Sequence, residues 1–275
     1  MYSQKKKTNR DLEGKNKIIE EKNKGILDSI NYAKRIQEAT LPSLEQVRMV
    51  FPESFILYKP KDVVSGDFYW FAECDEKKII AAVDCTGHGV PGAFMSMIGN
   101  AFLNEIVNAK KITAPAEILS ELRHMVIHSL KQSGVSGEAK DGMDISLISI
   151  SEKNNSAEWA GANIPLWRIR DGACEEFNAD KRPIGFHLGK SLPFTSRKIE
   201  LRQNDSLYLF SDGYADQFGG SKGKKFKRSQ MKELLSSIQK KPMNEQNKIL
   251  DIAIENWKGN IEQVDDILVI GIGIK

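Results

Sequence analysis

The stretch from Val83 to Ser96, VDCTGHGVPGAFMS, places a single carboxylate where an apolar run meets a glycine-rich loop. The run from Ile79 to Val83 is apolar and ends at Asp84. Three glycines follow, at positions 87, 89 and 92, and an apolar helical pattern comes after them. Glycine lets the chain turn sharply and leaves the space above the turn free of side chains. The stretch therefore predicts a strand, a tight loop and a helix, with Asp84 held at the edge of a buried sheet.

Three further aspartates have the same context. Asp67 follows VVSG and begins an aromatic strand, Asp212 ends LYLFS before a glycine, and Asp265, with Asp266 beside it, precedes the last apolar run. A single aspartate before glycine is most often a turn residue. Four carboxylates at one end of a sheet, however, would repel each other and lose hydration, and divalent cations would offset both costs. Oxygen ligands suit Mg²⁺ or Mn²⁺, and two such ions form a hydrolytic centre for phosphoryl groups.

The composition is that of a soluble globular protein. The chain has 275 residues, of which 40% are hydrophobic and 28% charged, enough for one large domain or two small ones. It has no apolar run near the roughly 18 residues that span a membrane and no signal peptide. The three cysteines are scattered, which predicts a reducing cytoplasm. The net charge is +3, and with Lys and Glu alternating in the basic N-terminal region we expect no nucleic-acid partner.

Residues 1–42 predict one long helix, because helix-favouring charged residues dominate and the first proline is Pro42. Apolar or small residues recur every seven positions, at Leu12, Ile19, Ile26 and Ala33. The positions three residues further on are polar, at Lys15, Lys22 and Ser29. Two interpretations stay open: a weak coiled coil or connector helix, and a helix that packs on its own domain. We divide the chain into a helical linker, 1–44, and a globular domain, 45–275.

The pattern after residue 50 groups strands with strands and helices with helices. Helices are predicted at 91–109, 114–130, 229–239 and 243–257. Residues 133–142 form a polar, glycine-rich loop. The predicted strands are 54–58, 67–74, 77–85, 143–151, 157–162, 166–172, 194–201, 205–212 and 266–274. This order is not the alternation of a parallel α/β sheet, so we expect an α+β fold of antiparallel sheets with helices outside.

Six segments occur in the order and with the approximate spacing of a known family: VVSGDFYWF, VDCTGHGVPGAFMSMIGNAFL, GMDISL, WAGANIPLW, LYLFSDGYADQFGG and QVDDILVIG. Together they resemble the SpoIIE/RsbU-type serine phosphatases, the bacterial branch of the metal-dependent PPM (phosphatase 2C-like) protein phosphatases. The resemblance covers about residues 45–275. The segment DSINYAKRIQEATLPS is similar to the helix that links an upstream sensor to the phosphatase in this branch.

The resemblance implies a four-layer α-β-β-α sandwich and a centre of two divalent cations, Mn²⁺ or Mg²⁺. By position, Asp84 bridges both ions and the Cys85 carbonyl is a further ligand. Asp67 binds the second ion, and Asp212 and Asp265 bind the first. The implied reaction is direct attack of a metal-bound hydroxide on phosphoserine or phosphothreonine. The implied substrate is a bacterial signalling protein of the STAS (anti-anti-sigma) type, and the N-terminal helix would join an upstream sensor or a second copy.

Several features depart from the family pattern or stay open. Leu268 stands where many relatives have threonine, and GANIP (161–165) replaces a Gly-His-Pro-like segment. No basic residue can be assigned to phosphate binding, and we interpret Arg182 as structural. His88 is interpreted as a support of its loop, and Asp144 as a candidate accessory ligand. The basic stretch 218–228 is either a substrate-recruiting surface or a solvated flap. The alternatives to a protein phosphatase are a catalytically silent signalling module that binds a partner and a hydrolase of other phosphate esters.

Overall fold

Two antiparallel sheets lie face to face in the computed structural model, which describes residues 2–135, 141–151, 153, 155–188 and 192–275. The first sheet contains five strands in the order β2-β3-β4-β5-β8. Its strands are β2 (Phe68–Cys74), β3 (Lys77–Cys85), β4 (Met143–Ser151), β5 (Ser156–Ala162) and β8 (Arg197–Glu200). The second sheet contains five strands in the order β1-β12-β9-β6-β7. These are β1 (Ser54–Lys59), β12 (Ile267–Gly273), β9 (Ser206–Phe210), β6 (Leu166–Arg170) and β7 (Ala173–Phe177).

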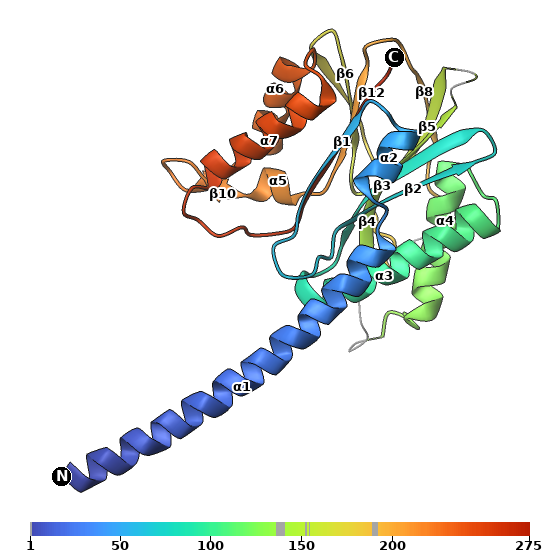
Figure 1. The fold of residues 1–275 in the computed structure, drawn as a ribbon. Helices are drawn as coiled ribbons and strands as arrows, with labels where there is room; N and C mark the ends of the chain where they lie inside the picture. Colours follow the sequence, from blue (N-terminus) through green and yellow to red (C-terminus); the bar gives the residue numbers. More distant parts are fainter. Residues whose placement is uncertain (1, 136–140, 152, 154, 189–191) are drawn as a thin grey trace.

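Helices cover the outer face of each sheet, which completes the four expected layers (Figure 1). The first sheet carries α3 (Gly89–Asn104), continued by a π-helical turn η1 (Glu105–Ala109), and α4 (Pro115–Ser129). The second sheet carries α6 (Arg228–Ile238) and α7 (Met243–Lys258). A third apolar cluster, which includes Ile80, Ile148, Trp159 and Leu268, fills the space between the sheets. The predicted α+β sandwich is confirmed.

The N-terminal helix α1 (Tyr2–Thr40) extends away from the sandwich (Figure 1). Leu12, Ile19 and Ile26 are 58%, 54% and 58% exposed. Only the last turns of the helix contact the domain, where Gln37 is buried. The interpretation in which this helix packs on its own domain is therefore wrong for residues 12–29. No helix in the described ranges is both long and apolar enough to cross a bilayer.

The two longest elements absent from the sequence-based prediction are a strand and a helix. The predicted strand 166–172 ends at Arg170, because Asp171 and Gly172 adopt positive φ angles of 50° and 79° and turn the chain into β7. An Asp-Gly pair is a strong signal for such a hairpin. Helix α2 (Leu44–Val50) begins with a capping box, in which the Ser43 hydroxyl accepts from the Gln46 N–H and the Gln46 side chain accepts from the Ser43 N–H.

Smaller differences concern the ends of elements. The predicted strand 194–201 is shorter, Arg197–Glu200, and the predicted strand 205–212 ends at Phe210. The helix predicted over 91–109 begins at Gly89 and finishes in η1. After Phe210 come a short helix α5 (Gly213–Asp216) and a two-stranded hairpin, β10 (Phe218–Gly219) with β11 (Lys224–Lys225). Half of the predicted loop 133–142, namely 136–140, lies outside the described residues.

Candidate metal centre

Each sheet contributes two of the four predicted aspartates to the same end of the sandwich. In the first sheet Phe68 pairs with Val83, so Asp67 and Asp84 lie side by side at one end of β2 and β3. In the second sheet Asp212 follows β9 and Asp265 precedes β12, and these two strands are antiparallel neighbours. The sheets pack face to face through β3, β9 and β12. The fold therefore brings together carboxylates that are up to 198 residues apart in the sequence.

Contacts across the two sheets join these residues into one cluster. The Asp212 N–H lies 3.5 Å from Asp84 Oδ2. Asp144 of β4 is the direct cross-strand partner of Asp84. The charge of Asp84 acts on Asp67, and that of Asp265 acts on Asp212. We call these five residues the carboxylate cluster: Asp67, Asp84, Asp144, Asp212 and Asp265.

The described residues offset the mutual repulsion of the cluster only in part. Burial raises the pKa of Asp67 well above its usual range, and the charge of Asp84 raises it further. Burial and the charges of Asp212 and Asp144 do the same to the pKa of Asp84. Burial also raises the pKa of Asp212, with a further contribution from Asp265. These pKa values are raised because several carboxylates of like charge are buried next to one another. A bound cation would lower the same pKa values.

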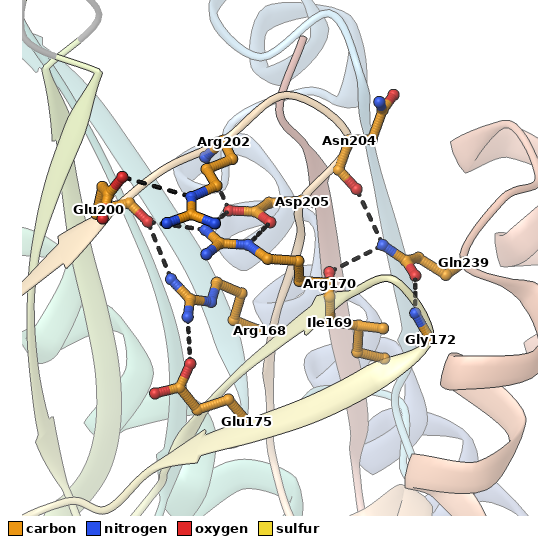
Figure 2. A network of polar contacts seen from close by, with 10 residues as sticks. All are labelled: Arg168, Ile169, Arg170, Gly172, Glu175, Glu200, Arg202, Asn204, Asp205 and Gln239. Carbon is orange, nitrogen blue, oxygen red and sulfur yellow. Dashed lines mark hydrogen bonds and ion pairs between the residues drawn. The ribbon is translucent and has the colours of Figure 1, made fainter.

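A buried carboxylate elsewhere in the same protein is paired with arginine. Asp205, whose side chain is fully buried, accepts from Arg170 Nε and Nη2, both at 2.6 Å, at the other end of β9 (Figure 2). Burial would raise the pKa of Asp205, but the hydrogen bonds from Arg170 and the Arg202 N–H offset this and lower it. Asp67 is similarly buried, at 3% exposure, but in the described part of the chain its Oδ2 has no hydrogen-bond partner. A buried carboxylate oxygen without a hydrogen-bond partner is expected where a cation binds.

The donor set fits Mg²⁺ or Mn²⁺. It consists of carboxylate oxygens, with the Cys85 carbonyl oxygen close by, 3.4 Å from the place where a β-carbon on Gly66 would lie. Within the described ranges no three Asp, Glu, His or Cys side chains converge tightly enough to enclose one ion. Mg²⁺ is commonly held through one or two carboxylates and keeps several waters. An open set of carboxylates is compatible with that preference.

Asp266, which the sequence left without a role, fixes the loop that carries Asp67. Its carboxylate is buried and accepts from the Lys61 N–H at 2.7 Å and from the Gly66 N–H at 2.8 Å. The neighbouring Asp265 accepts from the Asp266 N–H at 2.9 Å. Asp265 is therefore a member of the carboxylate cluster, whereas Asp266 anchors the loop that carries Asp67.

Two glycines beside the cluster, Gly66 and Gly92, are packed too closely to carry side chains. A β-carbon on Gly92 would lie 2.2 Å from the Gly87 carbonyl oxygen, and one on Gly66 would lie 2.4 Å from the same atom. Gly87 itself has a φ of +83°, which other residues rarely adopt. The start of α3, the loop after Asp84 and the loop before Asp67 thus meet around one carbonyl oxygen. This close approach places Asp67 and Asp84 relative to each other.

We expect Gly92→Ala to destabilise the fold by about 1–3 kcal/mol, because the added methyl group must displace backbone atoms. Metal-dependent turnover should fall as well, since the displaced loops carry Asp67 and Asp84. Chemical denaturation and turnover of the purified variant measure the two effects. Gly14→Ala in α1, where an added β-carbon meets no atom within 4 Å, is the control: it should leave turnover unchanged and should not destabilise the fold, because alanine favours a helix. An unchanged Gly92→Ala protein would mean that the close approach has no structural role.

His88 joins the two loops from the solvent side. Its Nδ1 lies 2.6 Å from Asp62 Oδ2, and its Nε2 lies 3.0 Å from Lys61 Nζ. It precedes α3 but its side chain makes no capping hydrogen bond to that helix. Lys61 and Asp62 belong to the loop that Asp266 anchors. The three side chains therefore hold that loop against the glycine-rich loop, which agrees with a supporting role for His88.

The other basic residues considered in the sequence lie in different places. Arg182 contacts the Pro193 carbonyl oxygen and lies 4.6 Å above the Phe194 ring, so its contacts are structural. In the stretch 218–228, Lys225 pairs with Asp216 at 2.7 Å. The charge of Arg228 lowers the pKa of Asp212 in part, against the larger effect of burial. The basic stretch thus borders the carboxylate cluster.

Comparisons with known proteins agree with this geometry. The family model for Stage II sporulation protein E (SpoIIE) matches residues 75–275. The SiaA-PP2C domain of Pseudomonas aeruginosa matches with a TM-score of 0.82 and 32% identity, covering 92% of this chain and 98% of that one. The PP2C phosphatase domain of SpoIIE from Bacillus subtilis, with a fragment of its regulatory domain, matches with a TM-score of 0.66 and 19% identity, covering 81% of this chain and 63% of that one. No curated protein sequence matches significantly.

A more distant match is RsbX in complex with magnesium, with a TM-score of 0.53 and 12% identity over 80% of this chain and 94% of that one. At such identity the likeness concerns the fold alone. The family model, by contrast, spans most of the globular part of this chain, and the SiaA-PP2C domain adds sequence identity over nearly the whole length. The chain therefore belongs to the SpoIIE family of bacterial PP2C-type phosphatases.

Proposed function

We propose that this chain hydrolyses phosphoserine and phosphothreonine on a bacterial signalling protein, using two divalent cations, Mg²⁺ or Mn²⁺. The observation that carries the proposal is the carboxylate cluster, in which two sheets bring aspartates of like charge to the same end of the sandwich. Such ions, when bound, supply positive charge to a phosphoryl group and lower the pKa of a water. The chain's own contribution is to hold the ligands rigidly and to exclude side chains from the space above them.

The placement of each aspartate suggests its role in the proposed centre. Asp84 lies beside Asp67 in its own sheet and faces Asp212 of the other sheet, the place expected of a ligand shared by two ions. Asp67, with its orphaned oxygen, would hold one ion from the first sheet. Asp212 and Asp265 would hold the other from the second sheet. The Cys85 carbonyl, next to Gly66, would complete the protein ligands.

The proposed substrate is a small phosphorylated regulator of the STAS type, and the proposed location is the cytoplasm. Solved structures with this fold include the RsbU and RsbW domains of a Mycobacterium tuberculosis protein. Another belongs to work on the bacterial stressosome, described as a modular system that controls secondary messenger signalling. These matches, at 17% and 16% identity, support a signalling role as a proposal for this chain.

The decisive test compares three classes of substrate under the same conditions. A phosphoserine peptide, a phosphotyrosine peptide and p-nitrophenyl phosphate are incubated with the purified chain and Mn²⁺, with and without a chelator. The proposal predicts metal-dependent release of phosphate from the phosphoserine peptide in preference to the phosphotyrosine peptide. Turnover of the small ester alone would favour a hydrolase of other phosphate esters. Metal binding without any turnover would favour a catalytically silent signalling module.

The end of α1 is connected to the Asp67 loop through one buried side chain. Gln37 Nε2 donates to the Ser65 carbonyl oxygen at 2.6 Å and to Ser96 Oγ of α3 at 2.9 Å. Its Oε1 accepts from the Ser65 N–H at 3.1 Å. Ser65 stands two residues before Asp67. A movement of α1 would therefore reach the proposed centre, which supports coupling to an upstream sensor or a second copy.

We expect Gln37→Ala to lower turnover by about tenfold, because the Ser65 N–H loses its partner, the Ser65 carbonyl oxygen keeps only the 3.4 Å bond from Ser96 Oγ, and the loop before Asp67 is held less firmly. A buried group left unpaired costs roughly 1–3 kcal/mol, so the unfolding midpoint should fall as well. The matched control is Glu38→Ala, one residue further along α1, where the side chain is 62% exposed. Steady-state kinetics on both variants measure the difference. Equal activity of the two variants would show that Gln37 does not connect α1 to the centre.

A further inference from the structure

The basic stretch 218–228 is a hairpin that packs on the domain, with β10 and β11 as its two arms (Figure 1). The Gly220 N–H donates to the Trp257 carbonyl oxygen of α7 at 2.8 Å, and a β-carbon on Gly219 would lie 1.9 Å from the same oxygen. Phe226, directly after β11, is buried, and its ring lies 5.2 Å from that of Tyr214 and 5.3 Å from that of Trp257. These contacts give the stretch one defined conformation, which an interaction surface requires.

The end of the basic stretch lies next to Asp212. Helix α5 begins directly after Asp212, and the Lys227 N–H donates to the Ala215 carbonyl oxygen of that helix at 2.7 Å. Lys227 has a φ of 76° and a ψ of 145°, a combination that suits glycine far better than a residue with a side chain. Such backbone conformations are concentrated at functional sites. Arg228 comes next, and its charge acts on Asp212. The basic stretch therefore reaches the edge of the carboxylate cluster.

Most of the positive charge in this stretch is available to a partner. Residues 222–228, KGKKFKR, contain five basic side chains. Lys225 pairs with Asp216 at 2.7 Å. The other four are exposed and form no ion pair with any residue that the structure describes: Lys222, Lys224, Lys227 and Arg228. Lys59, Lys110 and Lys232, by contrast, each pair with a carboxylate. Unpaired charge of one sign, gathered in one place, attracts a partner of the opposite charge.

The proposed metal centre cannot by itself attract an anionic substrate. Two divalent cations carry four positive charges, whereas the five aspartates of the carboxylate cluster carry five negative charges when they are ionised. A phosphoserine side chain adds about −1.5 to −2. Positive charge at the edge of the centre would raise the local concentration of such a substrate and increase its rate of association. The basic stretch is placed where that charge is needed.

We propose that the basic stretch binds acidic side chains that flank the phosphorylated residue of the protein substrate. This inference rests on the proposed function, because it states which protein segments the centre would receive. Arg228, whose charge reaches Asp212, would bind acidic residues close to the phosphoserine. The lysines of the hairpin, Lys222 and Lys224, would bind acidic residues farther along the segment. The substrate class is therefore phosphoserine or phosphothreonine within an acidic segment.

Three peptides that differ only in their flanking residues test this proposal. Each contains a non-hydrolysable phosphonate analogue of phosphoserine, with acidic residues on its N-terminal side, on its C-terminal side, or on neither. Fluorescence anisotropy measures the Kd of each peptide for the full chain with Mn²⁺. At least one acidic peptide should bind about tenfold more tightly than the neutral one, and this preference should shrink as salt screens the exposed charges. Equal Kd values for the three peptides would overturn the proposal.

Variants without these charges show whether the preference comes from the basic stretch. Lys222→Gln combined with Lys224→Gln should reduce the preference for the acidic peptide by about threefold, and adding Arg228→Gln should remove it. The matched control is Lys240→Gln combined with Lys248→Gln, which removes the same charge from exposed positions outside the stretch. The control should keep the full preference. A preference that survives in the triple variant, or that the control loses equally, would contradict the proposal.

Other anionic partners are separate outcomes of the same experiments. Vesicles that contain phosphatidylglycerol and a DNA duplex are each mixed with the wild-type chain and with the triple variant. Binding of either one that the triple variant loses would overturn the proposal in favour of a membrane or a nucleic acid. Phosphoserine hydrolysis without a preference for acidic flanks would leave the proposed function in place and refute the docking surface. Tight binding of the acidic peptide without hydrolysis of any phosphopeptide would do the reverse.

Discussion

Asp84→Asn is expected to abolish metal-dependent turnover and, in the same protein, to stabilise the metal-free fold. Asp84 lies at the middle of the carboxylate cluster, and burial together with the charges of Asp212 and Asp144 raises its pKa well above the usual range. Asparagine keeps the shape and an oxygen for the Asp212 N–H but removes the charge. Turnover should fall by at least about a hundredfold, the scale seen when a group that supports developing charge is removed.

Most substitutions at buried polar sites lower the free energy of unfolding, whereas this one is expected to raise it. Removing one of several like charges relieves repulsion, so the free energy of unfolding without metal should rise by roughly 1–3 kcal/mol at neutral pH. Turnover assays and denaturation in the presence of a chelator measure the two effects. Asp251→Asn is the matched control, because Asp251 lies on α7 outside the cluster and pairs with Lys59. An Asp84→Asn protein that keeps its activity, or that is less stable without metal, would refute this view of the cluster.

The stability of the metal-free protein should fall as the pH rises above the ordinary pKa range of aspartate. Asp67, Asp84 and Asp212 have folded-state pKa values above those of the unfolded chain. Over the pH range between the unfolded and folded values, the folded state binds more protons, and so the free energy of unfolding decreases with pH. Saturating Mn²⁺ should remove this loss, and a concentration a hundredfold above its Kd adds about 2.7 kcal/mol.

A comparison of wild type with Asp84→Asn separates the effect of the carboxylate cluster on stability from that of other titrating groups. Asp205, Glu176 and Glu255 have lowered pKa values, so their contribution changes with pH in the opposite direction and at lower pH. We therefore expect the stability difference between wild type and Asp84→Asn, measured without metal, to be largest at alkaline pH and to shrink on acidification. Thermal unfolding at several pH values, with chelator or Mn²⁺, measures this. A difference that stays constant with pH would show that the cluster is not ionised in the way described.

The four ligand candidates could be found in the sequence because each interrupts an apolar strand at its end. Asp67 and Asp84 then meet through the β2–β3 register, and Asp212 and Asp265 meet through the β9–β12 register. The hairpin at Asp171–Gly172 was not predicted, although that pair is a known turn signal and could have indicated it. Such local signals sufficed for the fold class and for the cluster.

The supporting contacts could not be predicted, because they join distant parts of the chain. Asp266 accepts from backbone groups 200 and 205 residues away, and nothing in the local sequence separates it from Asp265. Gln37 resembles any other polar residue of a long helix, and only the tertiary structure shows its bonds to Ser65 and Ser96. Contacts of this kind depend on where whole elements pack, whereas strand ends and turns depend on neighbouring residues.

The most direct test of the central claim is to locate Mn²⁺ by anomalous diffraction in crystals of the wild-type chain. The account predicts two peaks roughly 3.5–4 Å apart, with Asp84 between them, Asp67 on the side of the first sheet, and Asp212 and Asp265 on the side of the second. Crystals that diffract well and contain Mn²⁺ in excess but show no peak at the carboxylate cluster would contradict it.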